Sequence, residues 1–402
     1  MKTNKWIYFI ISSIVIVIIS MSSNSDTASA EELNLNTTQQ VVTFPVAFQR
    51  ATKDAINSIT ADGKGEILTI SDKYLNITRD YGKTWVSRSL PSSAIYHQIR
   101  IVQGVYYLSN SYTFNGESHY YSTDAVNWTP FTLEADNGLK LGIGNIQIVH
   151  GTRILLATSE KSNKVYVFTS PDGLNWVQKG SINDILWTGS PIIIWWNGSG
   201  YSAIAGGHSY YNYKKTTEIN HFLVNPKDDV GAELIVYTSS DLINWKLRSG
   251  AVNKKLFYTW NTTDIATGKF VPERNYYVYE EQPIDKGIIS LFDMYSNQLT
   301  SRDGITFNFK KSAAIFHKYS NDDYRTPIFQ LNNQYYVFTQ YWYSSGVIRT
   351  RLLTSKDKLN WKETKLNIMN KMEVIQSGKM FIGYNAKEVA ISSNGMNWKK
   401  IK

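Results

Sequence analysis

Carboxylates, arginines and aromatic rings are the side chains of this 402-residue sequence that could carry chemistry. Two carboxylates on neighbouring strands can act as the acid and the base of glycoside hydrolysis, and Glu273 is the first catalytic candidate. Arg325 is the second candidate, on a resemblance described below, and a planar guanidinium can pair with a substrate carboxylate through two hydrogen bonds. The further candidate carboxylates are Asp264, Glu280 and Glu281. Solvated surface acids would give the same pattern, so both interpretations stay open.

Aromatic residues gather in the longer segments between predicted strands. The segment 207–231 is the largest and contains Tyr211, and Tyr341 and Trp342 follow another predicted strand. Sugars stack their C–H faces on such rings while their hydroxyl groups bond to polar neighbours. We therefore predict a ligand-binding surface formed by Tyr211, Arg325, Tyr341 and Trp342. The alternative is that these rings cover small cores within the insertions.

The sequence contains no motif that indicates a metal site or a cofactor site. The six histidines are dispersed, without an H-x-x-x-H pattern or a carboxylate cluster at ligand spacing. A phosphate-binding loop is missing as well. The absence of cysteine excludes a thiol nucleophile and any disulfide. We expect no metal and no cofactor.

A repeated element that recurs seven times must position the candidate residues. Each copy has a hydroxyl residue, then any residue, then Asp or Asn, and an aromatic residue four or five positions further on. The copies are Thr78–Trp85, Ser122–Trp128, Ser170–Trp176, Ser239–Trp245, Ser301–Phe307, Ser355–Trp361 and Ser392–Trp398. Such internal repetition predicts one repeat architecture in place of the two or three domains that the length alone would suggest.

We interpret each copy as the turn of a β-hairpin and call it a repeat turn. Apolar residues precede it, as in Val165–Phe168, and a short strand follows, as in Val177–Lys179. The Asp side chain can accept hydrogen bonds from N–H groups two and three residues on, and Gly173, Gly304 and Gly395 can supply a positive φ at the next position. The aromatic residue is expected to pack between neighbouring sheets. We assign a structural, not a catalytic, role to Asp80, Asp124, Asp172, Asp241, Asp303, Asp357 and Asn394.

A second hairpin is predicted before each repeat turn. Its signals are a Gly or Asn turn followed by a strand, as in Gln103–Leu108, Asn333–Phe338 and Ser377–Ile382. Two hairpins form a four-stranded antiparallel unit, and such units packed radially are the blades of a β-propeller. The predicted fold class is therefore all-β, a β-propeller of seven four-stranded blades. A ring of five or six blades with a degenerate repeat is the alternative.

The first repeat, with its Gly82-x-Thr84-Trp85 ending, resembles the Asp-box, or bacterial neuraminidase repeat, of the sialidase-like propellers. The resemblance covers essentially all of the chain after the export signal described below. That group includes sialidases, other glycosidases, receptors and assembly factors, so the resemblance specifies a fold and leaves the function open. It also implies that the repeat turns lie away from the active face. The long loops are accordingly expected on the opposite face.

Two narrower resemblances bear on catalysis. Tyr324–Pro327 is similar to the Arg-Ile-Pro motif of sialidases, whose arginine binds the substrate carboxylate, and Arg100 and Arg274 also lie near predicted inner-strand starts. The motif departs from that pattern because Thr326 replaces the isoleucine and because it stands in the sixth repeat. Ser239–Trp245 is similar to segments of the five-bladed furanosidase-type glycoside hydrolases. Those enzymes would imply an acid and a base on inner strands.

The first thirty residues have the pattern of an export signal. Lys2 and Lys5 precede the apolar run 6–19, and Ala28-Ser29-Ala30 supplies a cleavage site. The apolar run is shorter than the ~20 residues of a membrane-spanning helix. We therefore predict a signal peptide over 1–30, an N-terminal segment over 31–50 and the propeller over 51–402. The cysteine-free, lysine-rich composition is typical of a protein exported from a Gram-positive bacterium.

The chain carries a net charge of +9, which favours anionic partners. The basic residues are scattered, and no nucleic-acid-binding motif accompanies them. We therefore expect a secreted propeller that binds carbohydrate or an anionic cell-envelope polymer, with no nucleic-acid partner and no integral membrane segment after signal cleavage. The alternative is a glycoside hydrolase of the sialidase-like or furanosidase-like kind.

Overall fold

The structure is a computed structural model of the chain. It describes residues 41–90, 98–109, 119–159, 161–162, 164–183, 192–205, 236–247, 276–277, 287–293, 298–303, 306, 308–310, 324–342, 348–367 and 371–402. The chain divides into two compact units, Met1–Leu35 and Asn36–Lys402, and all of these residues belong to the second. The predicted signal peptide lies outside the described residues. Within the ranges given, the regular elements are all strands, and no helix could cross a membrane.

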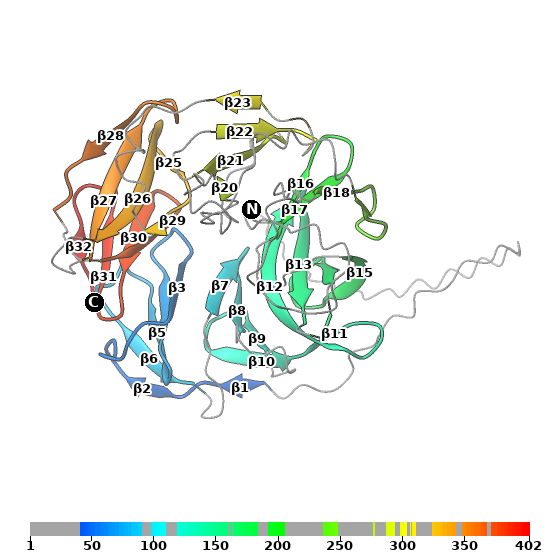
Figure 1. Cartoon of the computed structure of the whole chain (residues 1–402). Coiled ribbons are helices and arrows are strands. Elements are labelled where there is room, and N and C mark those ends of the chain that lie inside the picture. Colours follow the sequence, from blue (N-terminus) through cyan, green and yellow to red (C-terminus); the bar gives the residue numbers. More distant parts are fainter. Residues whose placement is uncertain are drawn as a thin grey trace, which may run out of the picture. The chain divides into compact units, whose positions relative to one another are not determined.

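The described strands form small antiparallel sheets that follow one another along the chain (Figure 1). Sheet one has the order β2-β6-β5-β4-β3, with β2 (Val46–Phe48), β3 (Ser58–Ala61), β4 (Ile67–Ile70), β5 (Tyr74–Thr78) and β6 (Val86–Ser89). Sheet two has the order β1-β10-β9-β8-β7, with β1 (Val42–Thr43), β7 (Gln98–Val102), β8 (Val105–Ser109), β9 (His119–Ser122) and β10 (Asn127–Phe131). Sheet three runs in chain order through β11 (Leu133–Glu134), β12 (Lys140–Val149), β13 (Thr152–Thr158), β14 (Val165–Ser170) and β15 (Val177–Ile182).

Four further sheets complete the described fold. Sheet four comprises β16 (Ile192–Trp196), β17 (Tyr201–Ala205), β18 (Val236–Ser239) and β19 (Lys246–Leu247). Sheet five comprises β20 (Tyr276–Tyr277), β21 (Ile289–Asp293), β22 (Gln298–Ser301) and β23 (Asn308–Lys310). Sheet six pairs β26 (Gln334–Trp342) with β24 (Tyr324–Arg325), β25 (Phe329–Leu331) and β27 (Ile348–Ser355), which in turn pairs with β28 (Trp361–Thr364). Sheet seven comprises β29 (Glu373–Ser377), β30 (Met380–Tyr384), β31 (Val389–Ser392) and β32 (Lys399–Lys400). The fold is all-β, with a propeller-like arrangement of small sheets.

The apolar core is divided among the interfaces between successive sheets. Leu68 and Leu75 of sheet one pack with Leu108 and Trp128 of sheet two in one cluster. Comparable clusters join sheets two and three, three and four, and six and seven. Because a middle strand meets a neighbouring sheet on both faces, its residues are buried without alternation, and all four residues of β4 are buried.

Every repeat turn joins the last two strands of its sheet in chain order, which confirms the predicted hairpin. In the second copy, Oδ1 of Asp124 accepts hydrogen bonds from the backbone N–H groups of Val126 and Asn127, each at 2.7 Å. The Ser122 hydroxyl donates to the same oxygen and accepts from the N–H of Ala125. The turns of Asp172, Asp241, Asp357 and Asn394 repeat the two backbone bonds. The side chain thus satisfies donors that a tight turn would otherwise leave unpaired.

The residue after the Asp has a positive φ in every repeat turn whose dihedral is described. Gly173 and Gly395 adopt φ values of 82° and 74°, as expected, and Gly304 lies outside the described residues. Residues with side chains adopt the same conformation in the other turns, namely Tyr81, Ala125, Leu242 and Lys358. The prediction that glycine supplies this φ was therefore too narrow, because the hydrogen bonds of the turn hold ordinary residues there as well.

Three repeat turns accept hydrogen bonds from the preceding sheet. Arg79 of sheet one donates to the carbonyl of Asp124 at 2.7 Å, and the Tyr107 hydroxyl of sheet two donates to the carbonyl of Gly173 at 2.6 Å. The Trp195 indole of sheet four donates to the carbonyl of Arg302 at 3.0 Å. The turns therefore fix the sheets to one another as well as closing hairpins.

Side-chain hydrogen bonds also join sheets one and seven, so the first sheet packs on the last. The Trp85 indole donates to the Ile401 carbonyl at 3.2 Å, and the Ser377 hydroxyl donates to the Ala61 carbonyl at 2.8 Å. Trp85 is buried in a cluster with Ile382 of sheet seven. Figure 1 shows the blue strands of sheet one beside the red strands of sheet seven.

We predict that Asp172→Ala lowers the free energy of unfolding by roughly 1–3 kcal/mol, because the donors on Leu174 and Asn175 lose their acceptor. Asp172→Asn should cost much less, since Asn394 accepts the equivalent pair of bonds. Chemical denaturation followed by circular dichroism provides the comparison. Equal losses for the two variants would contradict the assigned role of the side-chain oxygen.

Candidate functional site

Three of the predicted ligand-binding residues lie at one end of sheet six. Arg325 pairs with Thr339 across β24 and β26, and Tyr341 and Trp342 are the last two residues of β26. The turn that contains Asp357 joins β27 to β28 at the other end of the sheet. The backbone register therefore gathers Arg325, Tyr341 and Trp342 at the end away from the repeat turn.

The other predicted residues cannot be added to this group. Tyr211 and Glu273 lie outside the described residues, as do Arg274 and the segment 207–231. Asp264, Glu280 and Glu281 lie outside them too. The acid and base roles proposed for these carboxylates stay predictions.

A buried polar layer supports the end of sheet six that holds these residues. Gln340 donates to the Met372 carbonyl at 2.9 Å, and the Met372 N–H donates to the Thr350 hydroxyl at 3.0 Å. Thr326 is fully buried, and its hydroxyl accepts from the N–H of Phe338 at 3.0 Å. These bonds fix β24, β26, β27 and the start of sheet seven. The backbone beneath Tyr341 and Trp342 is thus held in place, as a binding site requires.

Polar side chains also link the inner strands of neighbouring sheets. Arg100 of β7 donates to Oδ1 of Asn145 of β12 at 2.9 Å, so this arginine joins sheets two and three. Gln147 of β12 donates to the Ile192 carbonyl at 2.6 Å, and Gln376 of β29 donates to the Gln330 carbonyl at 2.7 Å. Sequence reasoning missed these amides, because a single polar residue within an apolar strand carries no spacing signal.

The carboxylates of the repeat turns are strong hydrogen-bond acceptors. The side chain and backbone of Thr84 lower the pKa of Asp80 to about 2. Burial opposes the same effect at Asp124, where the backbone bonds from Asn127 and Val126 nevertheless lower the pKa to about 2. A carboxylate that stays ionised near neutral pH is a poor general acid. The low pKa values follow from the hydrogen bonds that close the two turns.

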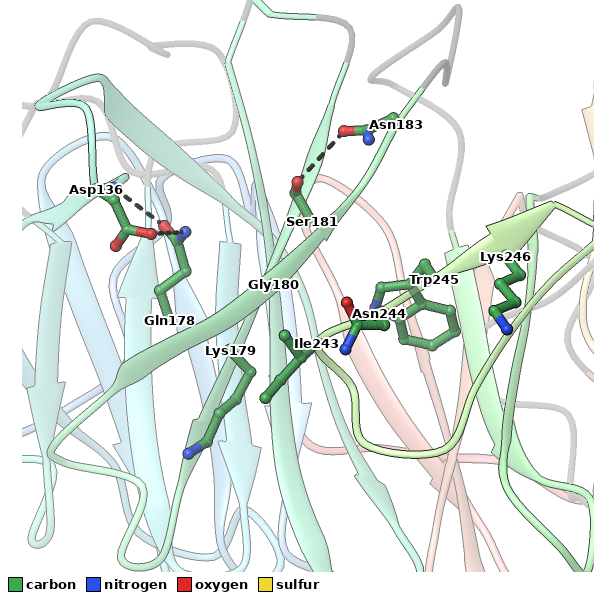
Figure 2. A pocket seen from close by; sticks show the side chains of 10 residues that line it. All are labelled: Asp136, Gln178, Lys179, Gly180, Ser181, Asn183, Ile243, Asn244, Trp245 and Lys246. Atoms are coloured by element: carbon green, nitrogen blue, oxygen red, sulfur yellow. Dashed lines mark hydrogen bonds between the residues drawn. The ribbon is translucent and has the colours of Figure 1, made fainter. Parts of the chain in front are cut away.

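A groove of about 500 Å³ opens on the outer rim, between β15 of sheet three and the repeat turn of sheet four (Figure 2). Lys179 and Asn183 line it from one side, and Ile243, Trp245 and Lys246 line it from the other. Ile243 is 50% exposed. Sequence reasoning did not predict this groove, because it forms between segments about sixty residues apart.

Possible metal ligands are scattered in the described part of the chain, which contains no group of three or more His, Cys, Asp or Glu able to hold an ion.

The sequence matches no protein-family model and no curated protein. In fold, the chain is similar to virginiamycin B lyase from Staphylococcus aureus, with a TM-score of 0.45 and 10% identity over 87% of this chain and 97% of that chain. It is also similar to a protein from Lactobacillus plantarum, with a TM-score of 0.47 and 7% identity over 80% and 87% of the two chains. The WD40 domain of SCAP from fission yeast gives a TM-score of 0.43 and 11% identity over 90% and 89%. At such identities the likeness concerns the fold alone.

We predict that acid destabilises the fold through the repeat turns. A carboxyl group whose pKa is lower in the folded state stabilises the protein above its unfolded pKa, and that stability is lost as the pH falls through the folded value. For Asp80 and Asp124 the window lies between 3.8 and about 2. Unfolding free energies measured from pH 5 to pH 2 should fall in this range.

Asp124→Asn should make the pH dependence shallower in the same range, because the amide keeps an acceptor oxygen without titrating. An unchanged slope in this variant would show that Asp124 does not contribute to acid sensitivity.

Proposed function

We propose that the chain is exported and binds carbohydrate or an anionic cell-envelope polymer on the face opposite the repeat turns. The register of sheet six carries the proposal, because it gathers Arg325, Tyr341 and Trp342 at one end. Aromatic rings can stack on sugar C–H faces, and a guanidinium pairs with the acidic groups of an anionic polymer. The hydrogen-bonded layer of Gln340, Thr350 and Met372 supports a fixed arrangement of these residues.

We also propose that each sheet is one blade, giving a seven-bladed propeller of the Asp-box, sialidase-like kind. The support lies in the recurrence of the repeat turn between the last two strands of each sheet in chain order. The packing of Trp85 against sheet seven supports closure of one ring.

Trp342→Ala should weaken the binding of an acidic oligosaccharide several-fold, because a stacking contact contributes on the order of 1 kcal/mol. A glycan array with the mature protein would select the oligosaccharide, and titration calorimetry would compare the variants. The melting temperature should change little.

Tyr81→Ala is the matched control, since Tyr81 is an exposed aromatic residue, at 40% exposure, on a repeat turn. It should leave binding unchanged. If Trp342→Ala instead lowers the melting temperature sharply while binding persists, Trp342 is a core residue. Hydrolysis of a fluorogenic glycoside panel, abolished by Glu273→Gln, would favour the glycoside hydrolase alternative.

The proposed export leads to a separate prediction. With cleavage after Ala30, the protein recovered from the culture medium should begin at Glu31. Amino-terminal sequencing of the secreted protein provides the measurement. A product that stays in the membrane fraction with Met1 intact would contradict the proposal.

A further inference from the structure

Two departures from regular strand geometry shape the rim groove. Val167 of β14 pairs with Gly180 of β15, but the next residue, Phe168, pairs with Gln178, so Lys179 forms a β-bulge. A Cβ at Gly180 would lie 2.5 Å from the carbonyl oxygen of Ile243. The glycine thus lets the repeat turn of sheet four lie directly against β15. Bulges commonly redirect a side chain at functional sites, and here the bulged residue is a lysine.

Two lysines from different sheets line this groove. Lys179 comes from sheet three and Lys246 from sheet four, and Figure 2 shows them on either side of Ile243 and Trp245. Both are exposed, and within the described part of the chain neither ammonium group forms an ion pair. The carboxylate of Asp136, which also lines the groove, accepts a bond from Gln178 at 2.6 Å. Two such cations attract an anionic ligand.

The remaining lining residues are typical of a site for sugars. Trp245 is half-buried and packs against the apolar core of sheets three and four, so its indole is held in place. With Ile243 it gives an apolar surface for sugar C–H groups. Ser181 donates to Oδ1 of Asn183 at 3.3 Å, and the hydroxyl lone pairs and the amide N–H groups can bond to sugar hydroxyl groups. The volume of about 500 Å³ falls within the range of small-molecule sites.

We propose that the rim groove is a second binding site, separate from the end of sheet six, for a short stretch of an anionic polymer with a sugar or polyol backbone. The two lysines bind carboxylate or phosphate groups, and Trp245 and Ile243 contact the sugar or polyol backbone. The groove is open, so it admits the middle of a polymer chain as well as its end. The residues Arg325, Tyr341 and Trp342 form what we call the sheet-six surface. Together with this surface, the groove would bind one polymer at two places and raise the overall affinity without further contacts.

The test compares two double variants of the mature protein. Lys179→Ala with Lys246→Ala removes both cations from the groove. Lys362→Ala with Lys399→Ala is the control, because each of these exposed lysines directly follows the Trp of a repeat turn, as Lys246 does, and neither lines the groove. Both double variants change the net charge equally, so general electrostatic attraction falls equally in both. The probes are oligogalacturonate, its methyl ester and oligo(glycerol phosphate).

We expect the groove variant to bind an acidic probe about ten-fold more weakly, as two modest ion pairs would give, and the control to change less than about two-fold. The methyl ester should bind weakly to every form. Preference for oligogalacturonate or for oligo(glycerol phosphate) identifies the carboxylate or the phosphate as the group bound. Equal losses in both double variants, no loss in the groove variant, or no saturable binding of either acidic probe by the wild type would overturn the proposal.

Trp342→Ala, measured with the same probes, separates this proposal from the preceding one. If Trp342→Ala loses binding and the groove variant does not, the end of sheet six is a binding site and the groove is not. If the groove variant loses binding and Trp342→Ala does not, the groove is a binding site and the end of sheet six is not. Thermal unfolding of each variant shows whether a loss of binding is a loss of folding.

Discussion

The carboxylate-centred turn is the interaction on which the rest of this fold depends. In each regular copy, one side-chain oxygen accepts two backbone N–H groups, while the preceding hydroxyl holds the start of the turn. Carbonyl groups of three such turns accept hydrogen bonds from Arg79, Tyr107 or Trp195 of the preceding sheet. The same turns that close the hairpins therefore also join neighbouring sheets. The isosteric Asn394 accepts the equivalent two bonds, so the turn can form without a charged acceptor.

Because the repeat turns lie at one end of each sheet, the two ends differ in the contacts that they make. The end with the repeat turn is occupied by contacts to the neighbouring sheet, and its carboxylates are engaged by N–H groups. The opposite end carries the connections that vary in length, and in sheet six it holds Arg325, Tyr341 and Trp342 above a hydrogen-bonded base. The rim groove follows from the same packing. Gly180 lets the turn of sheet four approach β15 closely, and the adjacent bulge at Lys179 places a charge beside it.

Local sequence patterns predicted what local interactions determine. The hydroxyl-x-Asp spacing located the hairpin turns, and the Gly and Asn signals located the turns before them, because both depend on backbone contacts within a few residues. The positive φ of Leu242 and Lys358 was missed, since it is held by the whole turn and not by residue type. β1 and β2, which add to sheets two and one, were missed because strand pairing over about forty to eighty residues leaves no local pattern. The groove was missed for the same reason.

Closure of sheet one on sheet seven affects how binding and stability are related. Trp85 joins sheet one to Ile401 near the C-terminal end of the described chain, and Ser377 bonds back to Ala61. Each sheet therefore has a neighbour on both sides wherever its packing is described, and its strands are fixed by two interfaces. A loop at the end of such a sheet can change in length or sequence without removing either interface. Ligand contacts carried by strand ends, as in sheet six, or by the outer rim, as in the groove, can thus vary largely independently of the core.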